Sequence, residues 1–168
     1  YKRQLAEGGN ALEAMVAMAA MIAVVYPHMT HVGGDGFWLI RFPNGRLHSI
    51  MAAGPAGEYA NPDFYEGFET IPPRGPFAAL TVPRAIGGWM LALEAAKANG
   101  GTLPPDVLLL PTIVQARNGY VVSRSQARLT ADKLFELSVA PGFAETFLRD
   151  GEPPAEGSTM TQEALAAT

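Results

Sequence analysis

The first side chains able to do chemistry are two histidines and an aspartate close together in the sequence, His28, His31 and Asp35. Imidazole nitrogens and carboxylate oxygens are common metal ligands, and the spacing of the histidines would let them share one ion. The sequence places all three in a loop and supplies no further ligand nearby, so we predict no metal site. The chain contains no cysteine, which excludes disulfides and thiolate ligands.

Asp35 lies within a glycine-rich loop formed with Gly33, Gly34 and Gly36. Such a density of glycine keeps side chains away, either for a steep helix-to-strand connection or for close approach by a ligand. The residues leave both interpretations open. A phosphate-binding loop is disfavoured because such loops follow a strand and open a helix. Here the glycines follow a helix and open a strand, and Asp35 adds negative charge, so no nucleotide cofactor is predicted.

The composition limits the class of protein. With 168 residues and 17.8 kDa, the chain is long enough for one domain with a sizeable core. The net charge of −4 and the absence of a basic run argue against a nucleic-acid partner. The longest apolar run, from Ala14 to Tyr26, is shorter than the roughly 20 residues that cross a bilayer, so no membrane span is predicted. No signal peptide is visible, and the compartment is left open.

The elements that position the glycine loop are a helix before it and a hairpin after it. Asn10 and Glu13 form a capping box that predicts a helix over 11–25, apolar on every face and therefore covered on all sides in a layered fold. Asn44-Gly45 joins two predicted strands, 37–42 and 47–51, and favours a type I′ turn between them.

Further elements are expected downstream. The stretch 51–76 is irregular and aromatic, and we expect it to border a pocket. The patterns predict a strand over 77–82, helices over 85–98, 105–117 and 123–137, and a last helix from Gln162 capped by Thr159 or Thr161. The helix over 85–98 has an apolar stripe, expected to be its buried face, at Ile86, Trp89, Met90 and Leu93. Because the last helix reaches Thr168 after about one turn, we expect the chain to be part of a larger protein.

Several separated motifs resemble the γ-glutamyltranspeptidase family and follow the family order. They are Gly8-Gly9-Asn10-Ala11, Gly33-Gly34-Asp35-Gly36-Phe37, Thr81-Val82-Pro83 with Gly88, Ala116-Arg117-Asn118-Gly119-Tyr120-Val121-Val122, and Gly151-Glu152-Pro153 with Leu165-Ala166. The match covers nearly the whole chain.

This resemblance implies an α+β fold, the four-layer α-β-β-α sandwich of N-terminal-nucleophile hydrolases. Residues 1–168 would be the N-terminal portion of that one domain, incomplete at both ends. Members of the family are precursors that cut themselves into a large and a small subunit, and the nucleophile is the threonine freed at the start of the small subunit. That threonine would lie downstream, so no catalytic residue is expected in this stretch. The partners would be the rest of the same precursor and a small-molecule amide substrate.

The resemblance also singles out a departure from the family. Transpeptidases carry Arg-Glu-x-Ala-Pro after the hairpin turn, and the arginine binds the α-carboxylate of the γ-glutamyl group. Here the segment reads Met51-Ala52-Ala53-Gly54-Pro55, without either charge. The candidate pocket residues are Met51 at the position of the arginine, Arg84 as a possible replacement cation, and Asp35 in the glycine loop.

Three interpretations of this departure stay open. The enzyme could accept a different acyl group, as cephalosporin acylases and oxamate amidohydrolase do. Another cation could replace the arginine, with Arg84 the first candidate and Arg41, Arg46 and Arg74 weaker ones. The protein could also be a catalytically inactive scaffold.

Overall fold

The computed structural model describes residues 1–168, which form two compact units. The first unit consists of residues 1–53, 83–120 and 161–168, and the second consists of residues 54–82 and 121–160. No helix of the protein has the length and apolarity needed to cross a membrane.

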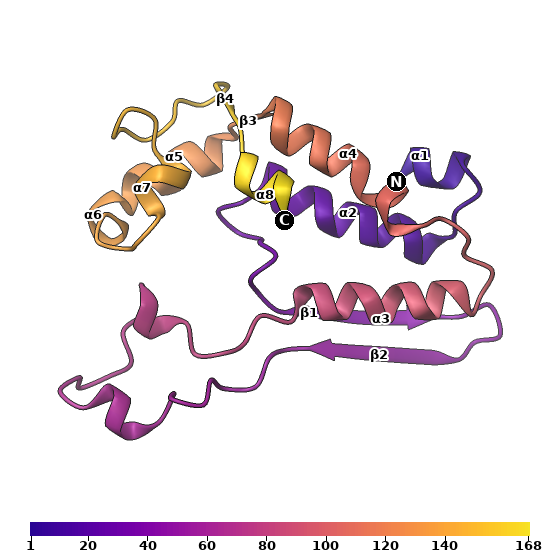
Figure 1. Ribbon diagram of the computed structural model, residues 1–168, viewed down its shortest axis with the longest axis horizontal. Coiled ribbons are helices and arrows are strands. Elements are labelled where there is room, and N and C mark those ends of the chain that lie inside the picture. The colour runs from indigo at the N-terminus through magenta and orange to yellow at the C-terminus, as the bar shows by residue number, and fades with distance from the viewer. The chain divides into compact units, whose positions relative to one another are not determined.

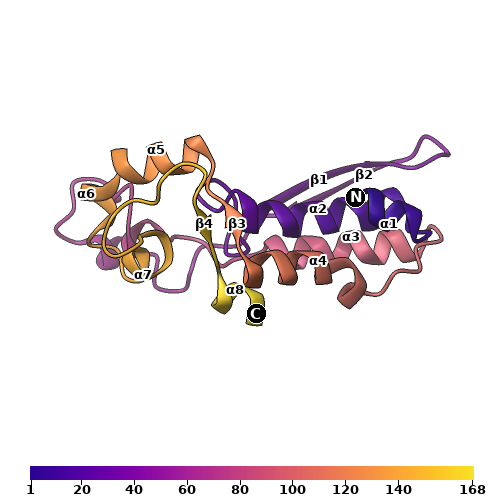
Figure 2. The same ribbon diagram turned by 90° about the horizontal axis from the view of Figure 1, so that it is seen from above.

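The first unit is layered (Figures 1 and 2). An antiparallel hairpin, β1 (Gly36–Arg41) and β2 (Leu47–Ala52), forms one layer. Helices α2 (Ala11–Val25) and α3 (Ala85–Lys97) cover one face of it, and α4 (Pro105–Asn118) packs on the far side of α2. The short helices α1 (Lys2–Ala6) and α8 (Glu163–Ala167) pack against α2 and α4, respectively. The core cluster between hairpin and helices contains Val16, Ile40, Phe42, Ile50, Ala52 and Ala92.

The capping box predicted for α2 is confirmed and extends to a distant part of the chain. The side chain of Asn10 accepts the backbone N–H groups of Leu12 and Glu13, and the N–H of Asn10 donates to Glu13 Oε2 at 2.7 Å. Glu13 is only 2% exposed, and its other oxygen accepts the N–H of Leu103 at 2.7 Å. This carboxylate therefore joins the start of α2 to the connection between α3 and α4.

The expectation that α2 is covered on every face was wrong for this chain. Its alanine and valine residues are buried, whereas Met15 and Ile22 are nearly half exposed. Helix α3 and the core cluster at the hairpin cover one side of α2, and α4 covers another, whereas this chain does not cover the side that carries Met15 and Ile22.

The hairpin occurs where it was predicted, but its turn is not type I′. The N–H of Gly45 donates to the carbonyl of Phe42, and only Gly45 has a positive φ, of 82°. Pro43 fixes a negative φ at the first central position, which a type I′ turn forbids. The connection is consistent with a type I turn followed by a glycine in the left-handed region.

The apolar stripe predicted for α3 is not its buried face. Helix α3 buries its small residues, Ala85, Gly88, Ala92 and Ala96, while Ile86 and Met90 are about half exposed. Trp89 and Leu93 of the stripe do pack partly against the core. A Cβ atom on Gly88 would lie 2.7 Å from Ala52 Cβ, so the helix approaches the hairpin too closely for a larger residue.

The remaining helices of the first unit follow the prediction with one change at the end. Helix α4 begins at Pro105 and continues through Pro111. Helix α8 is preceded by Gln162 as N-cap, without a side-chain hydrogen bond. Neither Thr159 nor Thr161 caps it. Thr159 belongs to strand β4 (Thr159–Met160), and Thr161 precedes the N-cap residue.

The second unit contains an aromatic loop and short helices. The stretch predicted to be irregular, 51–76, is so from residue 54 onward apart from a 3₁₀ turn at Pro62–Tyr65, whereas residues 51 and 52 belong to β2. The rings of Phe64, Tyr65 and Phe68 gather around Phe77. The strand expected over 77–82 is absent: Pro76–Ala78 form a 3₁₀ turn, and a single bridge joins Thr81 to Ala56. A proline at the start of the segment and its aromatic packing favour the turn over an extended ladder.

The helix predicted over 123–137 is divided in two. Helix α5 (Arg124–Asp132) ends before Lys133, and α6 (Leu134–Leu137) follows. Beyond it, α7 (Phe143–Phe147) leads to a turn in which Asp150 and Gly151 both have positive φ. Strand β4 pairs with β3 (Tyr120–Val121) in a two-stranded sheet.

Candidate substrate-binding site

The three candidate pocket residues come from different elements that meet at one end of the hairpin. Asp35 immediately precedes Gly36, the first residue of β1, and Gly36 pairs with Ala52, the neighbour of Met51. Arg84 is the N-cap of α3, and its backbone N–H donates to the carbonyl of Gly34 at 3.1 Å. The structure therefore brings the glycine loop, the end of β2 and the start of α3 together.

Met51 and Ala52 face opposite sides of the hairpin, as neighbours in a strand must. Ala52 is 6% exposed and packs against Gly88 of α3. Met51 is 78% exposed on the outer face. This chain lacks the arginine and the glutamate of the family. Met51, at the position of the arginine, is on the exposed face, and Ala52, at the position of the glutamate, is buried against α3.

The residue opposite Met51 is Phe37, which is 71% exposed on the same outer face. Leu39 and Leu47 continue this apolar face toward the turn. Sequence reasoning did not select Phe37 as a site residue, although it follows the glycine loop directly. The signal that could have found it is the hairpin register, which pairs positions 37 and 51 once the turn is placed correctly.

The arginines proposed as replacement cations occupy different surroundings. Arg41 is on the outer face but four residues along β1 from Phe37, or about 14 Å at about 3.4 Å per residue. The guanidinium of Arg46 stacks on the ring of Phe42, 4.8 Å from its centroid. Neither is placed beside Met51. Arg84, by contrast, lies at the end of the hairpin that carries Met51, and its side chain makes no hydrogen bond that caps α3.

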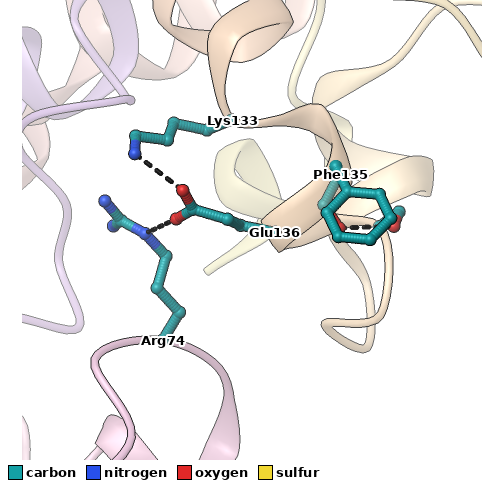
Figure 3. A network of polar contacts seen from close by, with 5 residues as sticks. Arg74, Lys133, Phe135 and Glu136 are labelled. Carbon is teal, nitrogen blue, oxygen red and sulfur yellow. Dashed lines mark hydrogen bonds and ion pairs between the residues drawn. The ribbon is translucent and has the colours of Figure 1, made fainter.

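Arg74 belongs to the second unit and is already paired. Its Nε donates to Glu136 Oε2 at 2.8 Å, and Lys133 Nζ donates to the other oxygen at 2.7 Å (Figure 3). These hydrogen bonds, that from Lys133 first, hold the pKa of the Glu136 carboxyl below its usual value. Arg74 thus has an anionic partner within its own unit.

The histidines of the loop pack beside other groups. The ring of His28 lies 4.2 Å from that of Tyr26, and burial lowers the pKa of His28. His31 lies under the glycine loop, where a Cβ on Gly34 would be 3.2 Å from its ring. This contact favours the steep-connection interpretation of the glycines. No three histidine, aspartate or glutamate side chains are grouped to hold a metal ion.

Two hollows of the first unit differ in chemistry. A cavity of about 310 Å³ between α2, α3, α4 and α8 is lined almost wholly by apolar residues, with no acid or base. A groove of about 340 Å³ runs along α2 past the glycine loop and is lined by Asp35, Phe37 and Trp38 among others. Of the candidate pocket residues, Asp35 lines this second hollow, whereas Met51 lines a separate groove of about 520 Å³ between the hairpin and α3.

Comparison with known proteins identifies the class to which this fold and site belong. Residues 2–168 match the family described as gamma-glutamyltranspeptidase. The chain belongs to the γ-glutamyltranspeptidase family.

Two curated relatives and one solved structure define the similarity further. The oxamate amidohydrolase proenzyme of Klebsiella pneumoniae is 52% identical over 165 residues, 98% of this chain and 31% of that protein. The glutathione hydrolase-like YwrD proenzyme of Bacillus subtilis is 38% identical over the same shares. The crystal structure of Helicobacter pylori γ-glutamyltranspeptidase superposes with a TM-score of 0.86 at 27% identity, covering 99% of this chain and 48% of that one.

These comparisons confirm the fold class expected from the sequence. The chain is the α+β N-terminal portion of the N-terminal-nucleophile hydrolase sandwich, with its hairpin and two covering helices forming one sheet layer and one helix layer. It spans about a third of the length of the curated relatives that it matches.

Proposed function

We propose that the chain is the start of the large subunit of a self-cleaving amidohydrolase or acyltransferase whose acyl pocket does not bind a γ-glutamyl α-carboxylate. Two observations support this proposal. The chain aligns along 98% of its length with about a third of the length of relatives that are proenzymes. At the position where the family has its carboxylate-binding arginine, an exposed methionine faces an exposed phenylalanine.

The chemistry would follow from a threonine downstream of residue 168. Self-cleavage frees its α-amino group, whose pKa near 8 makes it a suitable base for the adjacent hydroxyl. The hydroxyl attacks the amide carbonyl, the amine leaves, and water or an acceptor amine then takes the acyl group from the threonine. This chain would contribute the core of one layer and one wall of the acyl pocket.

Met51 decides the acyl specificity in this proposal. A γ-glutamyl group would place its carboxylate against Met51 and Phe37, where it finds no bidentate donor. Loss of the partner of a desolvated charge costs about 2–5 kcal/mol of binding. An acyl group that does not present a carboxylate there avoids this penalty. The 52% identity to an oxamate amidohydrolase proenzyme, against 38% to the glutathione hydrolase-like protein, favours the same conclusion.

The test uses the full-length precursor. Intact mass spectrometry and a denaturing gel would follow its conversion to two fragments, the second beginning with threonine. The matured sample would then receive oxamate, γ-glutamyl-p-nitroanilide and glutaryl-p-nitroanilide. We expect cleavage and turnover of oxamate well above that of the γ-glutamyl anilide. An uncut precursor that turns over nothing would support the inactive scaffold instead, and efficient γ-glutamyl turnover would contradict the specificity.

Arg84 gives a second candidate specificity, because it begins at the same end of the hairpin. If its guanidinium replaced the family arginine, the enzyme would retain γ-glutamyl substrates. In that case Arg84→Gln would raise KM for γ-glutamyl-p-nitroanilide by about tenfold or more, as loss of a charged partner predicts. Arg41→Gln, a matched change at the far end of the hairpin, would leave this KM unchanged.

A further inference from the structure

Phe37 has a position that the proposed function does not yet use. The antiparallel register places it directly opposite Met51, and directly opposed residues in such a pair have Cβ atoms about 5 Å apart. Both side chains are more than two-thirds exposed on the outer face of the hairpin. A group that contacts the side chain of Met51 from this face therefore also comes within reach of the Phe37 ring.

The packing of the hairpin on its helices does not account for this aromatic side chain. The opposite face buries Ile40 and Ile50 against α2 and α3, whereas Phe37 is outside this core cluster and 71% exposed. Phe37 also lines the groove that passes the glycine loop, next to Asp35. It thus lines that groove and is also paired with Met51, which occupies the position of the family arginine.

We infer that Phe37 is a specificity-determining residue that forms, with Met51, an apolar wall for the end of the substrate's acyl group. This inference rests on the proposed function and narrows its substrate class. The pair favours an acyl chain with an aliphatic end, as in a linear aliphatic amide, and disfavours an acyl chain that ends in a carboxylate. An aromatic ring adds a large apolar contact without a hydrogen-bonding group.

Chain length supplies an internal control. In a γ-glutamyl or pentanoyl amide the far end is four carbons from the scissile carbonyl, so it reaches the position of residue 51. In oxamate the carboxylate is bonded directly to that carbonyl, so the acyl group ends before the pair. Changes at Phe37 should therefore alter the longer substrates and leave oxamate nearly unaffected.

The experiment compares pentanoyl- and glutaryl-p-nitroanilide, which differ by a methyl against a carboxylate at the chain end, using the matured full-length enzyme. A compound that is not turned over is measured as a competitive inhibitor of the best substrate. We expect the wild type to prefer the pentanoyl group. Phe37→Ala should lower kcat/KM, or raise the inhibition constant, for the pentanoyl compound by about tenfold, since a lost apolar contact has this magnitude. Phe37→Leu should restore most of the loss.

The control is Leu47→Ala, which removes a large exposed side chain from the same face near the turn. It should change neither pentanoyl nor oxamate kinetics beyond about twofold, the scatter expected for a residue outside the pocket. An equal loss for oxamate and the pentanoyl compound in Phe37→Ala would mean a structural role and overturn the inference, as would no loss for either. A wild type that neither cleaves itself nor turns over any amide would instead overturn the proposed function.

Discussion

The inner face of the β1–β2 hairpin carries Trp38, Ile40 and Ile50, and the outer face carries Phe37, Leu39 and Met51. Both sets are large and apolar, yet the inner set packs against α2 and α3 while the outer set is exposed. Apolar character alone therefore does not distinguish a core face from a face that is open to a substrate or to another layer. The helices distinguish them, because α2 and α3 pack on the inner side, where Gly88 lets α3 approach the hairpin closely.

The largest effect is expected from Ala52→Glu, which restores the family glutamate on the inner face. Ala52 is buried beside Gly88, so an ionised carboxylate there would be desolvated without a partner. We expect a loss of about 3–5 kcal/mol in the free energy of unfolding. Urea denaturation of the full-length precursor measures it. Ala52→Ser, which is nearly isosteric, is the control. A glutamate tolerated as well as serine would show that the inner face is not tightly packed.

The next effect is expected at the contact between helix and hairpin. Gly88→Ala would place a methyl group 2.7 Å from Ala52 Cβ, and overpacking of this kind costs about 1–3 kcal/mol. Gly87→Ala is the matched control on the same helix. No atom lies within 4 Å of its Cβ position, so it should stabilise the helix by about 0.5–1 kcal/mol. Equal denaturation midpoints for the two variants would contradict the close contact.

On the outer face, Met51→Arg should change function with little change in stability. Met51 is exposed, and surface substitutions usually alter the free energy of unfolding by less than about 0.5 kcal/mol. A guanidinium at this position can bind a carboxylate bidentately. We expect kcat/KM for γ-glutamyl-p-nitroanilide to rise about tenfold or more relative to oxamate. An unchanged ratio would place residue 51 outside the acyl pocket.

The smallest effect is expected from an exposed polar contact in the second unit. The pKa of Glu136 is lowered by Lys133 and Arg74, so its contribution to stability exists above the pKa of the unfolded chain and disappears as the pH falls through the folded value. Because these groups are exposed, solvent screens the interaction. Glu136→Gln should leave the urea midpoint almost unchanged at pH of about 7 and unchanged at pH of about 3. A clear loss only at the higher pH would show a stronger contact.

Local signals predicted the elements that surround the site. The capping box at Asn10 and Glu13 fixed the start of α2, and Asn44-Gly45 located the hairpin turn. Both depend on residues close together in the sequence. The type I′ geometry was wrong because the constraint from Pro43 outweighs the preference of the Asn-Gly pair.

Features that depend on distant packing were not predictable in the same way. The buried face of α3 is made of alanine and glycine because the hairpin approaches there, which the apolar stripe of the helix does not reveal. Phe37 was missed for a related reason, since its importance comes from a partner fourteen positions later in the chain. The elements that carry the predicted site residues Asp35, Met51 and Arg84 meet at one end of the hairpin, and the roles of these residues stay predictions.

The buried carboxylate of Glu13 has a consequence for the order in which the protein folds. One of its oxygens is satisfied by the neighbouring Asn10, but the other requires the N–H of Leu103, 90 residues later. Until that segment is synthesised and docked, water remains the second hydrogen-bond partner of the carboxylate, and Glu13 cannot be buried at the start of α2. Contacts of such sequence separation form late because their loop-closure entropy must be overcome first. On the ribosome, the helix that forms early would thus be completed only after α3 has emerged.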